Sequence, residues 1–225
     1  MKCFFLPLLV TFLIGTGCNA PAKEPPERSF REIINQRARA DARVDTFSTL
    51  ADRERILGDS TAPVWIVAVI DFQCAECKRW YDDMLPGLRD GPVKQSRARV
   101  ALLQMPADAH LNAMASAIGA VCAATEGKYW DVTSRIFATQ DAWKNLPDAR
   151  PYLDSVAIST GVDPAVHRQC TERARGMKLV QTDAERSKTA GVDSLPTFFI
   201  GTHRLVGYST PAAFRAVLDS ALAGR

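Results

Sequence analysis

Two cysteines separated by two residues, Cys74 and Cys77, are the residues in this chain best suited to chemistry. Cysteines at this spacing can close a small disulfide at the start of a helix without a large backbone movement. At that place free N–H groups and the positive end of the helix dipole favour a thiolate at Cys74. Cys77 lies on the apolar stripe of the predicted helix, so its sulfur should be buried. The pair therefore predicts an exposed attacking thiol and a shielded thiol that resolves the mixed disulfide formed by the first.

The same spacing also occurs in zinc sites, which need two further ligands. The sequence has no second CxxC and no close Cys–His pair, and His110, His167 and His203 are scattered along it. Each histidine is expected to be structural or to lie on the surface. We therefore expect neither a metal nor a cofactor.

The segments on either side of the cysteine pair favour redox chemistry. The apolar, β-branched run over residues 64–70 predicts a strand that is covered on both faces. After Cys74 the apolar residues recur at helical spacing, until Pro86 and Gly87 are expected to disturb the helix. A second strand is expected over residues 100–105. So short a strand–helix–strand unit implies a parallel pair with a right-handed crossover.

The rest of the chain predicts a helical block and a closing β-β-α unit. Helical spacing extends over about residues 108–188. One apolar stripe of the first helix in this block is expected to hold Leu111, Met114, Ile118, Val121 and Cys122. Strands are expected over 196–200 and 205–208 with a turn over 201–204, and Thr210 should cap the last helix. The order β-α-β, helical block, β-β-α indicates an α/β fold.

A proline opens the third expected strand, in the run Ser194-Leu195-Pro196-Thr197. Proline lacks an N–H and is confined to special places in a sheet. A cis Leu195–Pro196 bond would leave the backbone of Leu195 free to pair with an extended substrate beside the disulfide. A trans proline at a strand edge is the plain alternative, and the residues alone do not separate the two.

A second pair of cysteines, Cys122 and Cys170, lies on different predicted helices of the block. The two could form a second redox pair or a structural disulfide. Both lie among apolar neighbours, which favours the structural reading.

The N-terminus is typical of an exported protein. Lys2 precedes an apolar run over residues 4–14, which has the length of a secretory signal core and is too short to span a bilayer. We expect residues 1–17 to be a signal peptide and the protein to reside in the periplasm or cell envelope.

Two cleavage sites compete in this region. Residues 16–18 resemble the end of a bacterial lipobox, in which Cys18 is lipidated, although Gly15 stands where Leu is usual. Cleavage after Ala22 is the alternative. A lipid on Cys18 would hold the protein on a membrane surface and would be its only membrane contact.

Residues 18–56 are expected to form a spacer and an N-terminal helical segment. The stretch 21–27 is rich in Pro and charge, and Ser29 and Glu32 form a capping box. The formal net charge is +3 without a dense basic stripe, so no nucleic-acid partner is expected.

Three segments resemble the DsbA-like branch of the thioredoxin superfamily. The first consists of residues 58–64 followed by residues 71–74, which lead to the CxxC. The other two are residues 110–130 and residues 191–200. The resemblance covers residues 57–225, which we take as one domain with a helical insertion over about 108–188. It implies a thioredoxin-like fold and a cis bond at Pro196, and it favours the structural reading of the second cysteine pair.

The chain departs from that branch inside and before the CxxC. Ala75 and Glu76 stand where the branch often has Pro and an aromatic residue or His. A carboxylate close to Cys74 is expected to oppose the thiolate. Ala68 replaces an acid found in many thioredoxin-like proteins, which removes a candidate proton acceptor for Cys77.

These patterns predict an exported thiol–disulfide oxidoreductase. Cys74, Cys77 and Pro196 are its expected catalytic residues, and Leu195 is expected to bind substrate. It would exchange a disulfide with exported client proteins, most simply by donating it, and would depend on a membrane redox partner of unknown identity. A thiol reductase with a thioredoxin-like potential and a non-catalytic, lipid-anchored binding or chaperone module are the alternatives.

Overall fold

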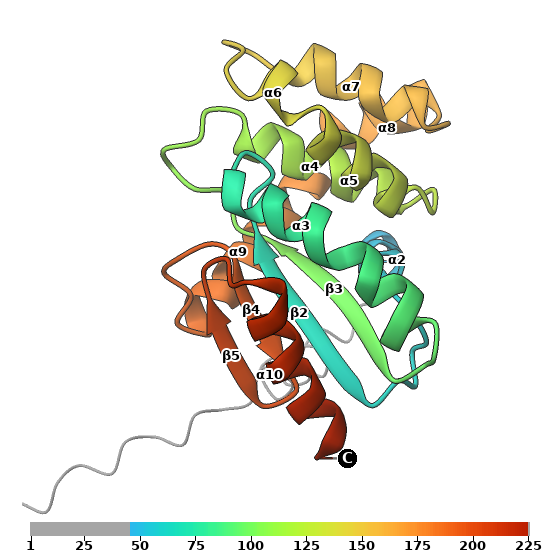
Figure 1. Ribbon diagram of the computed structural model, residues 1–225. Coiled ribbons are helices and arrows are strands. Elements are labelled where there is room, and N and C mark those ends of the chain that lie inside the picture. Colours follow the sequence, from blue (N-terminus) through green and yellow to red (C-terminus); the bar gives the residue numbers. More distant parts are fainter. Residues whose placement is uncertain (1–45, 225) are drawn as a thin grey trace, which may run out of the picture.

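The computed structural model describes residues 46–224, so the signal peptide, Cys18 and the capping box lie outside the described residues. Figure 1 shows the described chain as a sheet flanked and capped by helices. In chain order the elements are α2 (Thr46–Glu54), β1 (Ile56–Leu57), β2 (Val64–Ile70), α3 (Ala75–Leu88), the π-helical turn η1 (Arg89–Val93), β3 (Ala98–Gln104), α4 (Ala113–Ala124), α5 (Tyr129–Ala138), α6 (Gln140–Trp143), α7 (Arg150–Ser159), α8 (Pro164–Thr171), α9 (Ala174–Thr189), β4 (Thr197–Ile200), β5 (His203–Val206) and α10 (Pro211–Ala223).

The sheet has the strand order β1-β3-β2-β4-β5. β2 is parallel to β3, as the short crossover predicts, while β4 is antiparallel to β2 and β5 is antiparallel to β4. β1, which was not expected, pairs antiparallel with the outer edge of β3. The α/β, thioredoxin-like order of elements with an inserted helical block is confirmed.

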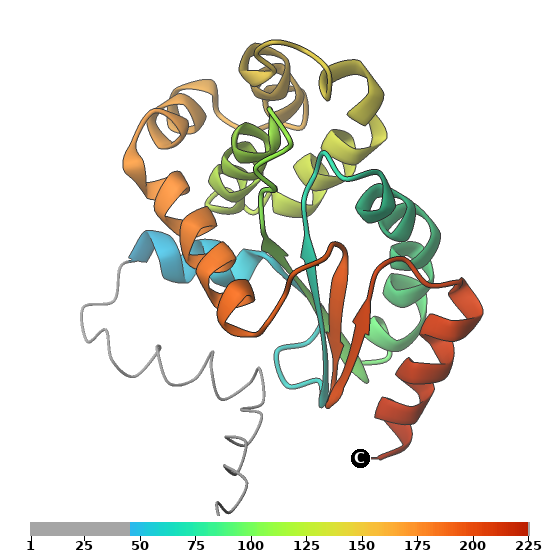
Figure 2. The same cartoon turned by 90° about the vertical axis from the view of Figure 1, so that its left-hand side faces the viewer.

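Helices cover both faces of the sheet and one of its ends. Figure 2 shows the sheet from the side, with α3 and α10 on one face, α2 and α9 on the other, and α4–α8 above its upper end. The central strand β2 is buried along almost its whole length, which explains its unbroken apolar sequence. On one face of the sheet Phe198 packs against Trp80 of α3 with ring centroids 4.9 Å apart, and against Phe214 of α10 at 5.4 Å. The opposite face carries a smaller cluster of buried residues, namely Val67, Val69, Leu103 and Val192.

Helix α3 continues through Pro86 to Leu88, so the expected disturbance at Pro86 and Gly87 is wrong. Both residues are exposed, while Leu85 and Leu88 on the opposite side of the helix are buried. The carbonyl that loses its N–H partner because of the proline belongs to Asp82, which is also exposed. The burial of the two leucines holds the last turn, and the chain then passes into the π-helical turn.

Three other predictions need correction. The expected apolar stripe of the first inserted helix is wrong at its start, because α4 begins only at Ala113 and leaves Leu111 70% exposed and Met114 37% exposed. The second hairpin strand covers His203–Val206 instead of 205–208, because the chain turns already at Gly201 with a φ of 59°. The strand of the parallel pair begins at Ala98, two residues before the predicted start. Thr210 caps α10 as predicted.

The residue that follows α2, Arg55, forms a buried ion pair with α9. The guanidinium of Arg55 contacts the carboxylate of Asp183 in α9, and the backbone N–H of Gln104 donates to the same carboxylate at 3.1 Å. Both charged side chains are almost fully buried, so each depends on the other for stability.

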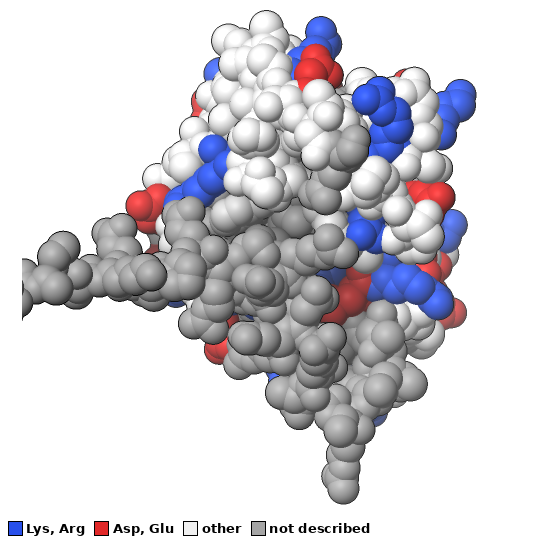
Figure 3. All heavy atoms as spheres, turned by 90° about the horizontal axis from the view of Figure 1, so that it is seen from below, with Lys and Arg blue, Asp and Glu red and all other residues white. Residues whose placement is uncertain are grey.

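The lower face of the molecule mixes acidic and basic side chains. In the coloured part of Figure 3, blue and red groups are interspersed among larger uncharged areas. Among the described residues, no helix combines the length and the apolar character that a bilayer crossing requires.

Candidate functional site

The cysteine pair lies where β2 ends and α3 begins. Cys74 is the N-cap residue of α3, one position before the first turn in which it was expected. Its Sγ accepts a hydrogen bond from the backbone N–H of Cys77 at 3.3 Å, which is the contact that a serine or aspartate oxygen makes at other N-caps. The carbonyl oxygen of Cys74 accepts the N–H of Lys78 at 3.1 Å. The first turn of α3 therefore holds both the sulfur and the carbonyl oxygen of Cys74.

The two thiols differ strongly in acidity. A hydrogen bond from the thiol of Cys77 and the backbone N–H groups of Cys77 and Glu76 lower the pKa of Cys74 to about 7. Burial raises the pKa of Cys77 well above its usual value, and the neighbouring Cys74 raises it further. At neutral pH about half of the Cys74 population is thiolate, whereas Cys77 keeps its proton. The structure thus pairs a more acidic, half-buried thiol with a buried thiol of raised pKa.

The carboxylate of Asp71 affects the pKa of both thiols. It is only 1% exposed and raises the pKa of Cys74 and of Cys77 by its charge. Its two oxygens accept hydrogen bonds from the N–H of Gln73 at 2.7 Å and of Ala107 at 2.9 Å, and His110 Nδ1 lies 2.7 Å from Oδ2. His110 was expected to be an isolated residue and instead belongs to the site.

The expected effect of Glu76 on Cys74 is wrong. Its carboxylate is turned toward Arg79, with Oε2 3.3 Å from Nη1, and it is not among the groups that raise the pKa of Cys74. Among the largest contributions to the pKa of Cys74, Glu76 contributes through its backbone N–H, which lowers that pKa.

The proline segment meets the cysteine pair at the same edge of the sheet. The Leu195–Pro196 bond is cis, which confirms the prediction that followed from the resemblance. Thr197 pairs with Val69, so the two residues before it lie beside the carboxyl end of β2, where the chain continues toward Cys74. The carbonyl of Pro196 accepts the N–H of Gly207 at 2.7 Å. Within the described part of the chain, no backbone hydrogen bond involves Leu195.

Amide side chains between this loop and the helical insertion were not predicted. Gln140, at the start of α6, donates to the carbonyl oxygens of Phe72 and Cys74. Gln73 accepts the backbone N–H of Asn112, and both side chains donate to carbonyl oxygens of the segment that follows α6. The spacing of apolar residues carries no signal for such contacts, because each joins segments far apart in the sequence.

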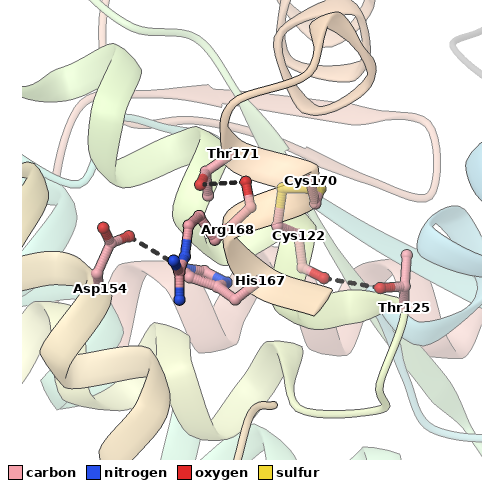
Figure 4. The surroundings of a disulfide bond; sticks show 7 residues. All are labelled: Cys122, Thr125, Asp154, His167, Arg168, Cys170 and Thr171. Atoms are coloured by element: carbon pink, nitrogen blue, oxygen red, sulfur yellow. Dashed lines mark hydrogen bonds and ion pairs between the residues drawn. A yellow bond between two sulfur atoms is a disulfide. The ribbon is translucent and has the colours of Figure 1, made fainter. Parts of the chain in front are cut away.

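Cys122 of α4 and Cys170 of α8 form a disulfide in the helical insertion, with their Cα atoms 5.7 Å apart (Figure 4). Both cysteines are buried, and His167 lies one helical turn before Cys170 with its Nε2 3.2 Å from Asp154 Oδ1. The bond joins two helices of the insertion, and both cysteines lie on elements other than those that hold Cys74 and Cys77.

Solved structures of low sequence identity share this fold. Alpha-DsbA1 from Wolbachia pipientis has a TM-score of 0.67 and 19% identity and covers 76% of this chain and 91% of its own. BdbD from Bacillus subtilis has a TM-score of 0.67 and 16% identity, with 75% and 92% covered. The catalytic domain of Proteus mirabilis ScsC has a TM-score of 0.63 and 18% identity, with 86% and 99% covered. The expected DsbA-like fold is thereby confirmed.

Curated relatives match a similar part of this chain. A protein named Na(+)/H(+) antiporter NhaA 3 from Salinispora tropica is 28% identical over 173 residues, which are 76% of this chain and 25% of the antiporter. NhaA 1 from Salinispora arenicola is 26% identical over 206 residues, or 90% and 30%. The chain thus spans less than a third of the length of these relatives. The family model described as thioredoxin matches residues 50–220, and the chain therefore belongs to the thioredoxin family.

Proposed function

We propose that this chain is a thiol–disulfide oxidoreductase that exchanges a disulfide between Cys74 and Cys77 with client proteins. The observation that carries the proposal is the difference between the two thiols at the tip of α3. Cys74 is half-buried with a pKa of about 7, whereas Cys77 is buried with its pKa well above the usual value. The first can attack or leave as a thiolate at neutral pH, and the second is protected from solvent and from clients.

In the donating direction, a client thiolate attacks Sγ of Cys74, and the bond to Cys77 breaks. Cys77 leaves with the electron pair and takes up a proton. A second client thiolate then attacks the client sulfur of the mixed disulfide, and Cys74 leaves as a thiolate. The client gains a disulfide and the chain is left with two reduced sulfurs. In the reducing direction the same steps run backwards, beginning with attack by Cys74 on a client disulfide.

The acidity of Cys74 bears on the direction of exchange. The sequence favours an oxidase, yet a pKa of about 7 is close to that of thioredoxin's attacking cysteine and far above the value of about 3.5 in DsbA. A weakly stabilised thiolate makes a disulfide less oxidising. This observation favours the reductase alternative. Measuring the equilibrium with glutathione decides between them. The disulfide of an oxidase would be reduced at glutathione ratios at which a thioredoxin-like protein keeps its disulfide.

Leu195 and Pro196 are proposed to hold the client. The cis bond lies at the sheet edge from which Cys74 projects, and the backbone of Leu195 makes no backbone hydrogen bond within the described chain. An extended client segment could pair with that backbone as an added strand while its sulfur meets Cys74.

We place this exchange in the cell envelope. The N-terminal sequence supports export, and one structural neighbour, with a TM-score of 0.63, is described as a periplasmic thioredoxin-like protein from Salmonella enterica. Lipidation at Cys18 and a membrane redox partner belong to the same proposal. Radiolabelled palmitate incorporated into the wild type but not into Cys18→Ser would support the anchor.

The test of the exchange itself is a trapping experiment. Cys77→Ser removes the resolving thiol, so mixed disulfides through Cys74 should accumulate when the protein meets envelope proteins. The matched control is Cys74→Ser/Cys77→Ser, which should form none. An absence of adducts with Cys77→Ser would count against exchange, and activity that survives Cys74→Ser would favour the non-catalytic binding or chaperone module.

A further inference from the structure

The backbone that leads into the cysteine pair is held by a glutamine of the helical insertion. Gln140 is 2% exposed, and its Nε2 donates to the carbonyl oxygen of Phe72 at 2.6 Å and to that of Cys74 at 3.2 Å. Both acceptors belong to the loop between β2 and α3. One side-chain amide therefore spans the loop on either side of Gln73.

Gln73 makes the second connection to the insertion, together with Asn112. The Nε2 of Gln73 donates to the carbonyl oxygen of Lys144 at 2.8 Å, and its Oε1 accepts the backbone N–H of Asn112 at 2.8 Å. Asn112 is 3% exposed and donates through Nδ2 to the carbonyl oxygen of Leu146 at 2.8 Å. The loop is thus bonded to the start of α4 and to the segment around α6.

Polar contacts of this kind impose a geometry that apolar packing does not. A buried amide is costly unless its donors and acceptors are paired, so the loop and the insertion are favoured only in the arrangement that pairs them. The carbonyl oxygen of Cys74, which accepts the hydrogen bond from Gln140, also accepts the N–H of Lys78 at 3.1 Å in the first turn of α3. Fixing that carbonyl fixes the peptide plane next to the Cα atom from which the side chain of Cys74 extends.

We propose that Gln140 is a positioning residue for Cys74, holding it in the N-cap geometry in which its sulfur accepts the N–H of Cys77. The helical insertion then takes part in the chemistry through the backbone that carries Cys74. The consequence for turnover rests on the proposed function, but the positioning itself is measured on the protein alone.

The experiment compares Gln140→Met with Gln104→Met in the otherwise unchanged chain. Methionine has nearly the length of glutamine and no N–H to donate. Gln104 is also fully buried, but its Nε2 donates to the hydroxyl of Tyr129 at 2.9 Å and not to a carbonyl of the loop. The readout is the pH titration of the Cys74 thiolate by its ultraviolet absorbance, together with thermal unfolding of both variants.

In Gln140→Met, Cys74 is no longer held in its N-cap geometry. The hydrogen bond from the backbone N–H of Cys77 to the Cys74 thiolate should therefore weaken. One hydrogen bond is worth about one pKa unit, so the midpoint should rise from about 7 to about 8. The thiolate fraction at pH 7 would then fall about fivefold, from about half to about a tenth. Gln104→Met should lower the unfolding temperature to a similar extent and leave the Cys74 titration where it is.

An unchanged Cys74 titration in folded Gln140→Met would overturn the proposal, as would an equal shift in Gln104→Met. If Gln140→Met fails to fold, Gln140→Asn serves instead, because it keeps the amide but withdraws it from both carbonyls and should give the same upward shift. The titration needs no client. A shift without client adducts in the trapping experiment would therefore refute the exchange function and leave the positioning intact, and adducts without a shift would do the reverse.

Discussion

Removal of the disulfide in the helical insertion should destabilise the protein without changing the chemistry of Cys74. The change is the double substitution Cys122→Ala/Cys170→Ala, which leaves Cys74 and Cys77 as the sulfurs able to form an internal disulfide in the described chain. The bond joins α4 to α8 inside the insertion. A structural role predicts a loss of stability, and a redox role predicts a loss of exchange activity.

The size of the loss follows from the length of chain that the disulfide closes. The two cysteines are 48 residues apart, and a loop of this length restricts the unfolded chain by about 4 kcal/mol in the chain-entropy picture. For a domain of this size each kcal/mol corresponds to about 2–4 °C in the midpoint of thermal unfolding. The double variant should therefore unfold about 8–16 °C below the oxidised wild type.

Urea unfolding at equilibrium measures this loss directly. Because the cross-link also keeps the unfolded chain compact, the variant should show a somewhat steeper dependence on urea than the wild type. Cys74→Ser/Cys77→Ser is the matched control, since it removes the other cysteine pair and keeps the structural bond. A loss below about 1 kcal/mol in the alanine variant would refute the loop-entropy reasoning. Unchanged stability with lost exchange would instead establish a second redox pair.

Three further outcomes are expected. Alkylation of the reduced protein by iodoacetamide should rise with pH around a midpoint near 7 as Cys74 loses its proton, with Cys77 unmodified below pH 9, as peptide mapping would show. Asp71→Asn removes a charge that raises the pKa of Cys74, so the thiolate absorbance should titrate below the wild-type midpoint; an upward shift would contradict the electrostatic argument. Gly176→Ala would place its Cβ 3.0 Å from Sγ of Cys122, and calorimetry should show destabilisation by about 1–3 kcal/mol.

The parts of the fold that were predicted correctly are those in which burial determines the pattern of apolar residues. β2 is apolar at every position because helices cover both of its faces, so its bounds follow from the composition of residues 64–70 alone. The buried stripe of α3 follows in the same way from helical spacing. Pro86 shows the limit of rules based on residue type alone, because the free-energy cost of a proline inside a helix depends on the side of the helix on which it lies. That side is set by what the helix packs against.

The parts of the site that were missed depend on directions and on long-range approach. Glu76 is adjacent to Cys77 in sequence, yet its carboxylate points to Arg79, so closeness along the chain gave the wrong sign for its effect. Asp71 and His110 are 39 residues apart, and Gln140 and Cys74 are 66 apart. No periodicity marks such pairs. The one available signal was a polar residue at the end of a buried strand, which Asp71 provides.

The meeting of these segments follows from the topology of the sheet. Because β2 and β3 are parallel, the loops that follow them leave the same edge, and this brings His110 to Asp71. Because β4 is antiparallel to β2, it begins at that edge, and this brings Pro196 to the loop that carries Cys74. The strand order therefore accounts for the meeting of these segments at one end of the sheet. In the proposed exchange, the direction depends instead on side chains that can change without altering the fold. The first is the buried charge of Asp71, and the second is the amide of Gln140 in the positioning role proposed above.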